Sequence, residues 1–238
     1  MNGDPTMVDA LLQAILMHYN VVNDAICVVF PPAVFLNQAQ EIVRNSGIFL
    51  GAQNVYPQDG GAYTGEISAP MLKTLGCRYV LVGHSERRHW FHEDEKFVAE
   101  KFHHVKYHGM IPVLCVGETL AQRQRGETEA VLSQQLEAVF KEHPDAFKSS
   151  VVAYEPVWAI GTGKTALPEE AQAVHAYIRS FVASVDEQAA QDLPIIYGGS
   201  VQAGNARSLL MMPDVDGGLL GGASLQAQSF LEVLKCIN

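Results

Sequence analysis

The sequence predicts an α/β fold built on a parallel sheet. Strand-like and helix-like segments alternate along the 238 residues, an arrangement typical of βαβ units. The strand-like segments are continuously apolar, as expected for strands covered by helices on both faces. Pro and Gly mark the ends of segments and no stretch reads as a linker, so we expect residues 1–238 to form a single domain.

The chain opens on an amphipathic helix. Asp4 is a suitable N-cap and Pro5 fits the first helical position. Apolar residues then recur at helical spacing, at Val8, Leu11, Leu12, Ile15 and Leu16. Seven further helical segments are predicted at residues 33–45, 69–75, 95–109, 129–143, 168–185, 205–212 and 225–238.

Seven segments are predicted as strands or as loops containing one, at residues 25–30, 48–53, 79–84, 111–118, 150–156, 193–200 and 215–224. Eight helices against seven strands leave the first helix without a preceding strand. A closed barrel of eight βα units would need one strand before Met1, whereas a doubly wound open sheet would not. The pattern of segments by itself leaves both architectures open.

Composition limits the possible partners and location of the protein. A formal net charge of −10 argues against nucleic acid and anionic membrane surfaces. No apolar run reaches the roughly 20 residues of a membrane helix, and residues 1–43 lack the Lys or Arg of a signal-peptide start. The cysteines are too far apart in sequence for a metal or redox motif, which favours a cytoplasmic location: Cys27, Cys77, Cys115 and Cys236.

Two polar residues that directly follow predicted strands are candidates for acid–base chemistry. His84 follows YVLVG and Glu155 follows VVAY. Each alone has an ordinary explanation, as a hydrogen-bonded capping histidine and an ion-paired loop carboxylate. In a parallel α/β fold both lie at the ligand-binding end of the sheet, where a base beside a polarising group is more credible than either residue alone.

The glycine-rich loops predict an anion site without an organic cofactor. YGGS at 197–200 and GGLLGGAS at 217–224 allow backbone N–H groups to approach a phosphate. The loop PVWAIGTGKTALPEE has stiff flanks and a glycine-containing centre, which suits a lid. GTGKTA lies too far past its strand for a dinucleotide site, and HSERRHWFH lacks the carboxylate or cysteine pattern of a metal site.

Five motifs, in order along the whole chain, resemble the triosephosphate isomerase family: GAQNVY with GAYTGEIS, VLVGHSERR, AYEPVWAIGTGK, YGGSV and LLGGASL. The resemblance implies a (β/α)8 TIM barrel and an isomerase of glycolysis and gluconeogenesis. Such an enzyme interconverts glyceraldehyde 3-phosphate and dihydroxyacetone phosphate through an enediolate. The resemblance also implies a homodimer that needs no metal or organic cofactor.

The same resemblance implies roles for individual residues. Glu155 would be the base that moves the proton, and His84 the neutral electrophile that polarises the carbonyl oxygen. Residues 156–166 would be the lid over the substrate phosphate. The backbone N–H groups that bind this phosphate would belong to Gly161, Ser200, Gly221 and Gly222.

Three further residues match supporting positions of the family. Glu86 and Cys115 match positions beside the catalytic residues, and we expect Glu86 to be partly buried. Thr64 matches the residue that reaches into the partner's site, which is the reason for expecting a homodimer.

The start of the chain departs from the family pattern. The family's first strand ends in Asn-x-Lys followed by Met-Asn-Gly, and here Met1-Asn2-Gly3 begins the sequence. We therefore expect the first strand, its Asn and the catalytic Lys to be missing from this chain. A gene start placed too late and a genuinely shortened protein both explain this. A catalytically dead barrel serving as a binding or dimerisation module is the alternative to an isomerase.

Overall fold

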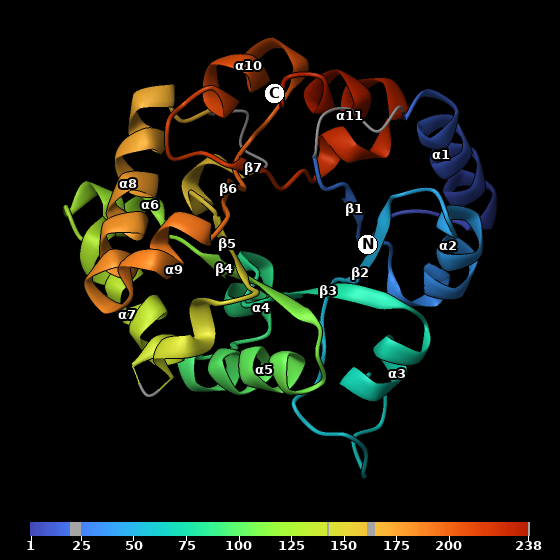
Figure 1. The fold of residues 1–238 in the computed structure, drawn as a ribbon, viewed down its shortest axis with the longest axis horizontal. Helices are drawn as coiled ribbons and strands as arrows, with labels where there is room; N and C mark the ends of the chain where they lie inside the picture. The colour runs from blue at the N-terminus through green and yellow to red at the C-terminus, as the bar shows by residue number, and fades with distance from the viewer. Residues whose placement is uncertain (20–24, 142, 161–164, 238) are drawn as a thin grey trace.

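The computed structural model describes residues 1–19, 25–141, 143–160 and 165–237. Its sheet contains seven parallel strands in chain order, namely β1 (Val28–Val29), β2 (Phe49–Ala52), β3 (Cys77–Val82), β4 (Ile111–Val116), β5 (Val151–Tyr154), β6 (Ile195–Tyr197) and β7 (Gly217–Gly218). The sheet curls into a ring, and the helices surround it on the outside (Figure 1). The predicted α/β class with a parallel sheet is confirmed.

The longer helices are α1 (Pro5–His18), α2 (Leu36–Val43), α5 (Glu95–Tyr107), α7 (Thr128–Phe140), α8 (Pro168–Val185), α10 (Ala203–Leu210) and α11 (Ala227–Leu234). The shorter ones are α3 (Ala69–Thr74), α4 (Ser85–Trp90), α6 (Leu120–Gln124), α9 (Glu187–Asp192) and the 3-10 turns η1 (Ala33–Phe35), η2 (Pro144–Phe147), η3 (Val157–Ala159) and η4 (Gly222–Leu225). Asp4 caps α1 as predicted, its carboxylate accepting the Met7 N–H at 2.9 Å. Among the described helices, none has the length and apolarity needed to cross a membrane.

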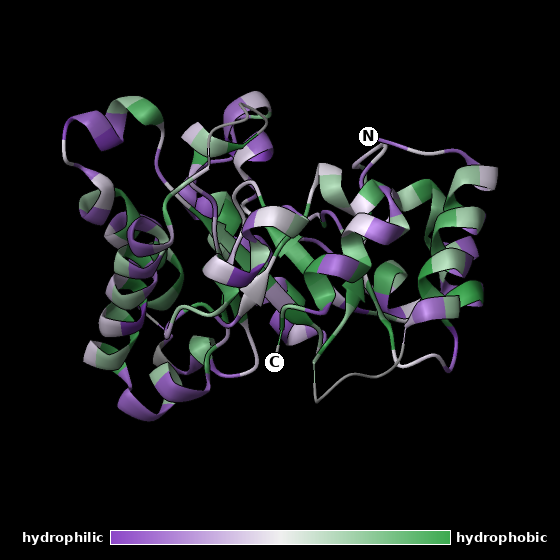
Figure 2. Cartoon of the chain, turned by 90° about the horizontal axis from the view of Figure 1, so that it is seen from above, coloured by the Kyte–Doolittle hydropathy of each residue, from purple (hydrophilic) through white to green (hydrophobic). Residues whose placement is uncertain are grey.

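Both faces of the sheet are buried, which explains why its strands are continuously apolar. Along β3, Val80 and Val82 pack outward in the core beneath the helices, while Tyr79 and Leu81 point into the ring. Figure 2 shows hydrophobic strands in the middle of the molecule and helices of mixed hydropathy around them. The small core inside the ring is formed by Tyr79, Leu81, Val113, Cys115 and Ala153.

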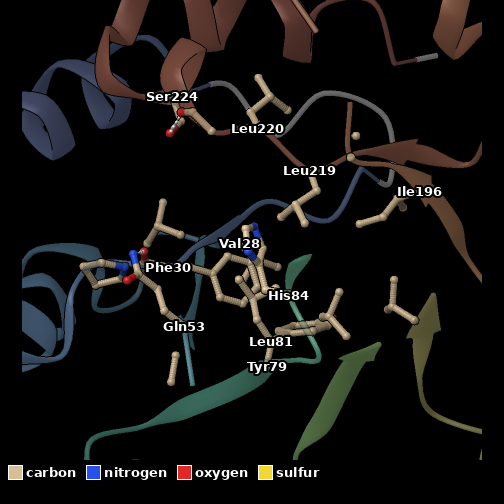
Figure 3. Close-up of a pocket in the computed structure, with 18 of the residues that line it drawn as sticks. Val28, Phe30, Gln53, Tyr79, Leu81, His84, Ile196, Leu219, Leu220 and Ser224 are labelled. Atoms are coloured by element: carbon tan, nitrogen blue, oxygen red, sulfur yellow. Dashed lines mark hydrogen bonds between the residues drawn. The ribbon is translucent and has the colours of Figure 1, made fainter. Parts of the chain in front are cut away.

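The ring is open along a seam between β7 and β1. These are the first and last strands of the seven-stranded sheet, and each is paired on one side in the described chain. A cavity of about 1960 Å³ runs along the seam and is lined by apolar side chains from both sides. They include Val28 from the β1 side, Leu219 just after β7, and Leu12 and Ile15 from α1. Figure 3 shows Val28, Leu219 and Leu220 around this space.

Several predicted element bounds were wrong. The segment predicted as a strand at 25–30 forms only the two-residue strand β1, because it borders the seam and pairs on one side. The segment at 215–224 contains the last strand as predicted, and this strand is also only two residues long. The helix predicted at 33–45 starts as a 3-10 turn and ends at Val43. Helices α4, α6 and α9 were missed, since five or six residues are too few to show a helical period.

Candidate active site

His84 and Glu155 meet at the carboxyl end of the sheet, as their positions after two strands predicted. His84 follows β3 and Glu155 follows β5, the two strands that flank β4. Nε2 of His84 lies 3.0 Å from one Glu155 carboxylate oxygen. The other oxygen accepts the backbone N–H of Ser85 at 2.8 Å. Glu155 is 2% exposed, so its carboxylate is held in a largely water-free site by two donors.

The first turn of α4 fixes the orientation of the His84 ring. His84 is the N-cap of α4, and its Nδ1 accepts the backbone N–H of Glu86 at 3.2 Å. The proton of the neutral ring is therefore on Nε2, which points at Glu155. Burial opposes protonation of the ring, whereas the hydrogen bond to Glu155 and the charges of Glu155 and Glu86 favour it. The net effect raises the pKa of His84 above its ordinary 6.5.

Replacing Glu155 with glutamine is expected to lower the pKa of His84. The substitution removes a charge that favours the imidazolium, and it leaves the opposing effect of burial in place. NMR titration of the histidine ring protons measures this pKa, and the spectrum of a His84→Gln variant assigns the signal. An unchanged or higher His84 pKa in Glu155→Gln would contradict the contact between the two side chains.

Gly198 packs closely against the side chain of Glu155. A Cβ at Gly198 would lie 2.9 Å from the Cγ of Glu155, so Gly198 provides the space this side chain needs. Cys115, on β4, is completely buried. Burial, and then the charge of Glu155, raise the pKa of the Cys115 thiol well above its ordinary value. Cys115 is therefore a neutral neighbour of Glu155, at the supporting position the sequence predicted.

Those predicted phosphate-binding residues that belong to the described part of the chain lie around the same cavity. Ser200, Gly221 and Gly222 line it together with His84 and Glu155. The Ser200 hydroxyl donates to the backbone oxygen of Ala159, at the start of the predicted lid. In Figure 3, His84 projects into the cavity, with Ser224 on its opposite side. Gly161 lies outside the described residues, as does the centre of the lid at 161–164.

The two remaining predicted residues are on the surface. Glu86 is exposed, contrary to the expectation that it is partly buried, and it lies at the open edge of the cavity that it helps to line. Thr64 is exposed in the loop between β2 and α3. Figure 1 shows this loop projecting away from the ring of helices.

The sequence analysis missed a buried polar network that anchors the predicted lid. Glu118, the second residue after the end of β4, has no exposed surface. Its carboxylate accepts hydrogen bonds from the Tyr154 hydroxyl at 3.2 Å and from Nε1 of Trp158 at 3.0 Å. Arg123 contacts Glu118 at 3.3 Å and also pairs with Glu170 at 2.7 Å.

The same network reaches the other end of the lid. A carboxylate oxygen of Glu170 accepts the backbone N–H of Leu167, the N-cap residue of α8, at 2.9 Å. Arg123 thus connects the segment before residue 161 to the segment after residue 164. The signal available in the sequence was the carboxylate of GETL directly after a strand, to which we gave no role.

Comparisons with known proteins agree with this geometry. A family model described as triosephosphate isomerase matches residues 1–237. A triosephosphate isomerase of Legionella pneumophila (strain Lens) is 57% identical over 238 residues, covering 100% of this chain and 96% of that protein. One from Nitrosomonas eutropha is 50% identical, covering 98% and 93%. One from Erwinia tasmaniensis is 47% identical, covering 99% and 92%.

Proposed function

Because the chain belongs to the triosephosphate isomerase family, we propose that it interconverts glyceraldehyde 3-phosphate and dihydroxyacetone phosphate by proton transfer through an enediolate. The observation that carries this proposal is the buried Glu155 carboxylate beside Nε2 of His84 at the cavity. A catalytically dead binding module is not favoured, since a dead barrel has no need for a base paired with a polarising donor.

Glu155 takes the proton from the carbon next to the substrate carbonyl and returns it to the neighbouring carbon. The carboxylate is held by His84 and the Ser85 N–H. Substrate therefore has to displace Glu155 from these partners before it can act as a base. Its burial then strengthens the carboxylate as a proton acceptor, since no water competes for it.

His84 polarises the carbonyl oxygen and stabilises the enediolate. Its Nδ1 is held by the α4 backbone, so Nε2 offers its proton to the substrate once Glu155 moves away. Loss of the contact with Glu155 removes an influence that favours the imidazolium, and the ring then acts as a neutral donor. The substrate's own carbonyl accepts the electrons, so the proposed reaction needs no metal or organic cofactor.

The substrate phosphate is proposed to bind backbone N–H groups of Gly161, Ser200, Gly221 and Gly222. Ser200, Gly221 and Gly222 face the cavity that holds His84 and Glu155. Residues 156–166 close over this site as a lid, with the Glu118–Arg123 network holding its two ends. Closure excludes water, which protects the enediolate from losing phosphate.

Deleting Ile160–Gly163 is expected to slow isomerisation and to raise the fraction of substrate that loses phosphate and becomes methylglyoxal. Without the lid, the enediolate is open to solvent. Isomerisation and inorganic phosphate release are measured on the same sample. Phosphate release per turnover equal to that of the parent would argue against a protecting lid.

We also propose that one further strand completes the barrel in the seam between β7 and β1, as the family pattern predicts. In the described chain, β1 and β7 each leave one edge unpaired at the seam, with apolar residues inside it and α1 behind it, which suits a buried parallel strand. We use the term completed barrel for residues 1–238 extended at Met1 by such a strand. The added strand ends in Asn-x-Lys. The completed barrel is proposed to act as one domain in the cytoplasm.

The function is tested by incubating the completed barrel with glyceraldehyde 3-phosphate and following dihydroxyacetone phosphate with glycerol 3-phosphate dehydrogenase and NADH. We expect the completed barrel to convert the substrate. The double variant that carries both His84→Gln and Glu155→Gln should lose this activity. No conversion by a folded completed barrel would reject the proposed function.

A homodimer is proposed to form through the loop between β2 and α3. Thr64 is exposed there, and Tyr63 keeps 42% of its surface exposed although its ring packs against Tyr56 at 4.4 Å. Such long loops are commonly functional.

Replacing Tyr63 and Thr64 with aspartate is expected to shift the completed barrel toward monomer and to lower its activity. Two added charges per chain oppose burial of this loop against a partner. Sedimentation velocity gives the oligomeric state, and Gln58→Asp at the base of the loop is the control. Equal sedimentation of the double variant and its parent would place the interface elsewhere.

A further inference from the structure

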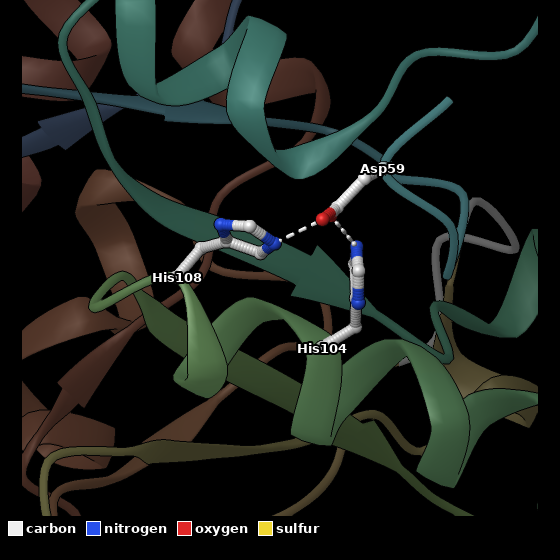
Figure 4. A group of neighbouring side chains, drawn as sticks. All are labelled: Asp59, His104 and His108. Carbon is white, nitrogen blue, oxygen red and sulfur yellow. Dashed lines mark hydrogen bonds and ion pairs between the residues drawn. The ribbon is translucent and has the colours of Figure 1, made fainter.

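A second cluster of side chains, unrelated to the cavity, lies where the loop after β2 meets the end of α5. His104 is on α5 and His108 caps its C-terminus, while Asp59 comes from the loop (Figure 4). Nε2 of His108 lies 2.6 Å from Oδ1 of Asp59, and Nε2 of His104 lies 3.2 Å from the same oxygen. All three potential ligand atoms are within 4.8 Å of one another.

The helix presents the two imidazoles together. Residues four apart lie on the same face of a helix, so His104 and His108 extend in the same direction. Their rings pack at a centroid distance of 4.8 Å. The side chains of His104 and His108 are 16% and 15% exposed, whereas Asp59 is 61% exposed. The cluster therefore has a protected side formed by the histidines and an open side facing solvent.

One ligand atom of the cluster is left unsatisfied. Nε2 of His104 is buried and has no hydrogen-bond partner, although it lies close to the Asp59 carboxylate. Buried polar atoms usually find a partner, so an unsatisfied one aimed at a carboxylate and a second imidazole needs an explanation.

We propose that Asp59, His104 and His108 bind one divalent transition-metal ion, Zn²⁺, which ties the loop after β2 to the end of α5. Two imidazoles and a carboxylate form a ligand set that Zn²⁺ accepts, with water as the fourth ligand on the exposed side. Ligand atoms of a tetrahedral zinc site lie about 3.3 Å apart, so binding requires His108 and Asp59 to separate slightly. The site is distinct from the cavity of the proposed isomerase and does not depend on that function.

Metal binding would order the loop that carries Thr64. Asp59 is the loop's ligand, and the histidines belong to a regular helix packed against the sheet. Coordination would restrict the loop because the Asp59 carboxylate would be held by the metal ion and would no longer move freely in solvent. Hydrogen exchange of the loop amides at 55–66 reports this ordering without any measurement of activity.

The test is titration of the EDTA-treated, purified completed barrel with ZnCl2 by calorimetry and with CoCl2 by visible absorption. We expect one Zn²⁺ per chain, visible bands of a four- or five-coordinate Co²⁺ without a thiolate charge-transfer band, and slower amide exchange at 55–66. His104→Ala, His108→Ala and Asp59→Asn should each weaken Zn²⁺ binding at least about tenfold. The Asp59 variant changes an exposed loop residue, so it tests the site even if a histidine variant folds poorly.

His18→Ala is the matched control, since it removes an exposed imidazole from another helix. It should bind Zn²⁺ as the parent does. Failure of the parent to bind Zn²⁺, or equal binding by the parent and the Asp59→Asn variant, would overturn the site. A thiolate band with Co²⁺ would equally overturn it, because the metal would then be bound by a cysteine.

Discussion

The Glu155→Gln variant of the completed barrel is expected to lose about 10²–10⁴-fold in kcat, with a much smaller change in KM. The amide keeps the size of the carboxylate and still accepts the Ser85 N–H, but it cannot take a proton. A base acts in the transition state, so its loss appears in turnover and not in ground-state binding. Steady-state kinetics with glyceraldehyde 3-phosphate measure both constants.

Glu169→Gln is the matched control for this substitution. Glu169 is an exposed carboxylate in the first turn of α8, outside the cavity. The control should keep the kcat of the parent. A Glu155→Gln enzyme with nearly unchanged kcat would end the assignment of Glu155 as the base.

The second large effect is expected from the strand in the seam. Residues 1–238 alone should have little or no isomerase activity and should aggregate readily, whereas the completed barrel should be soluble and active. Unpaired strand edges beside an apolar cavity promote association between chains. In our proposal, the added strand would also supply the lysine of Asn-x-Lys, a positive charge for the doubly charged substrate phosphate.

The described part of the cavity supports the need for that lysine. Its basic side chains there, apart from histidine, are Arg78 and Arg87, and Arg78 lies at the start of β3, at the opposite end of the sheet. Arg87 is already paired with Glu93 at 2.7 Å. At the end of the cavity beside His84, a phosphate therefore meets no basic side chain without an ion pair among the described lining residues.

A matched control separates the two effects of the strand. A completed barrel whose added lysine is replaced by methionine should be more soluble than residues 1–238 alone. It should remain as inactive as residues 1–238. Soluble yield and turnover of the three proteins are compared. Equal turnover by residues 1–238 and the completed barrel would contradict the proposal, and Lys164 would then be the first candidate for the missing charge.

The sequence was sufficient for the order of the elements and for the two residues at the centre of the chemistry. Continuously apolar segments report burial on both faces, which requires a parallel sheet between helices. Because parallel strands direct their carboxyl ends to one side, His84 and Glu155 could be placed at the same end of the sheet from their positions after two strands. The bounds of β1 and β7 could not be predicted from the sequence. Pairing with a neighbouring strand, and not hydropathy, decides where those strands stop.

Tertiary structure alone decided which side chains meet. Hydrophobic periodicity records the face of an element that is buried and contains no information about its neighbours in space. The carboxylate of Glu118 therefore looked like one more loop residue until folding placed it against Trp158 and Arg123. In the same way His104 and His108 were only two histidines one helical turn apart, and it is the path of the loop after β2 that adds Asp59 to them. Such contacts join segments distant in the chain, and their free energy depends on packing that forms only when the sheet curls and its helices close around it.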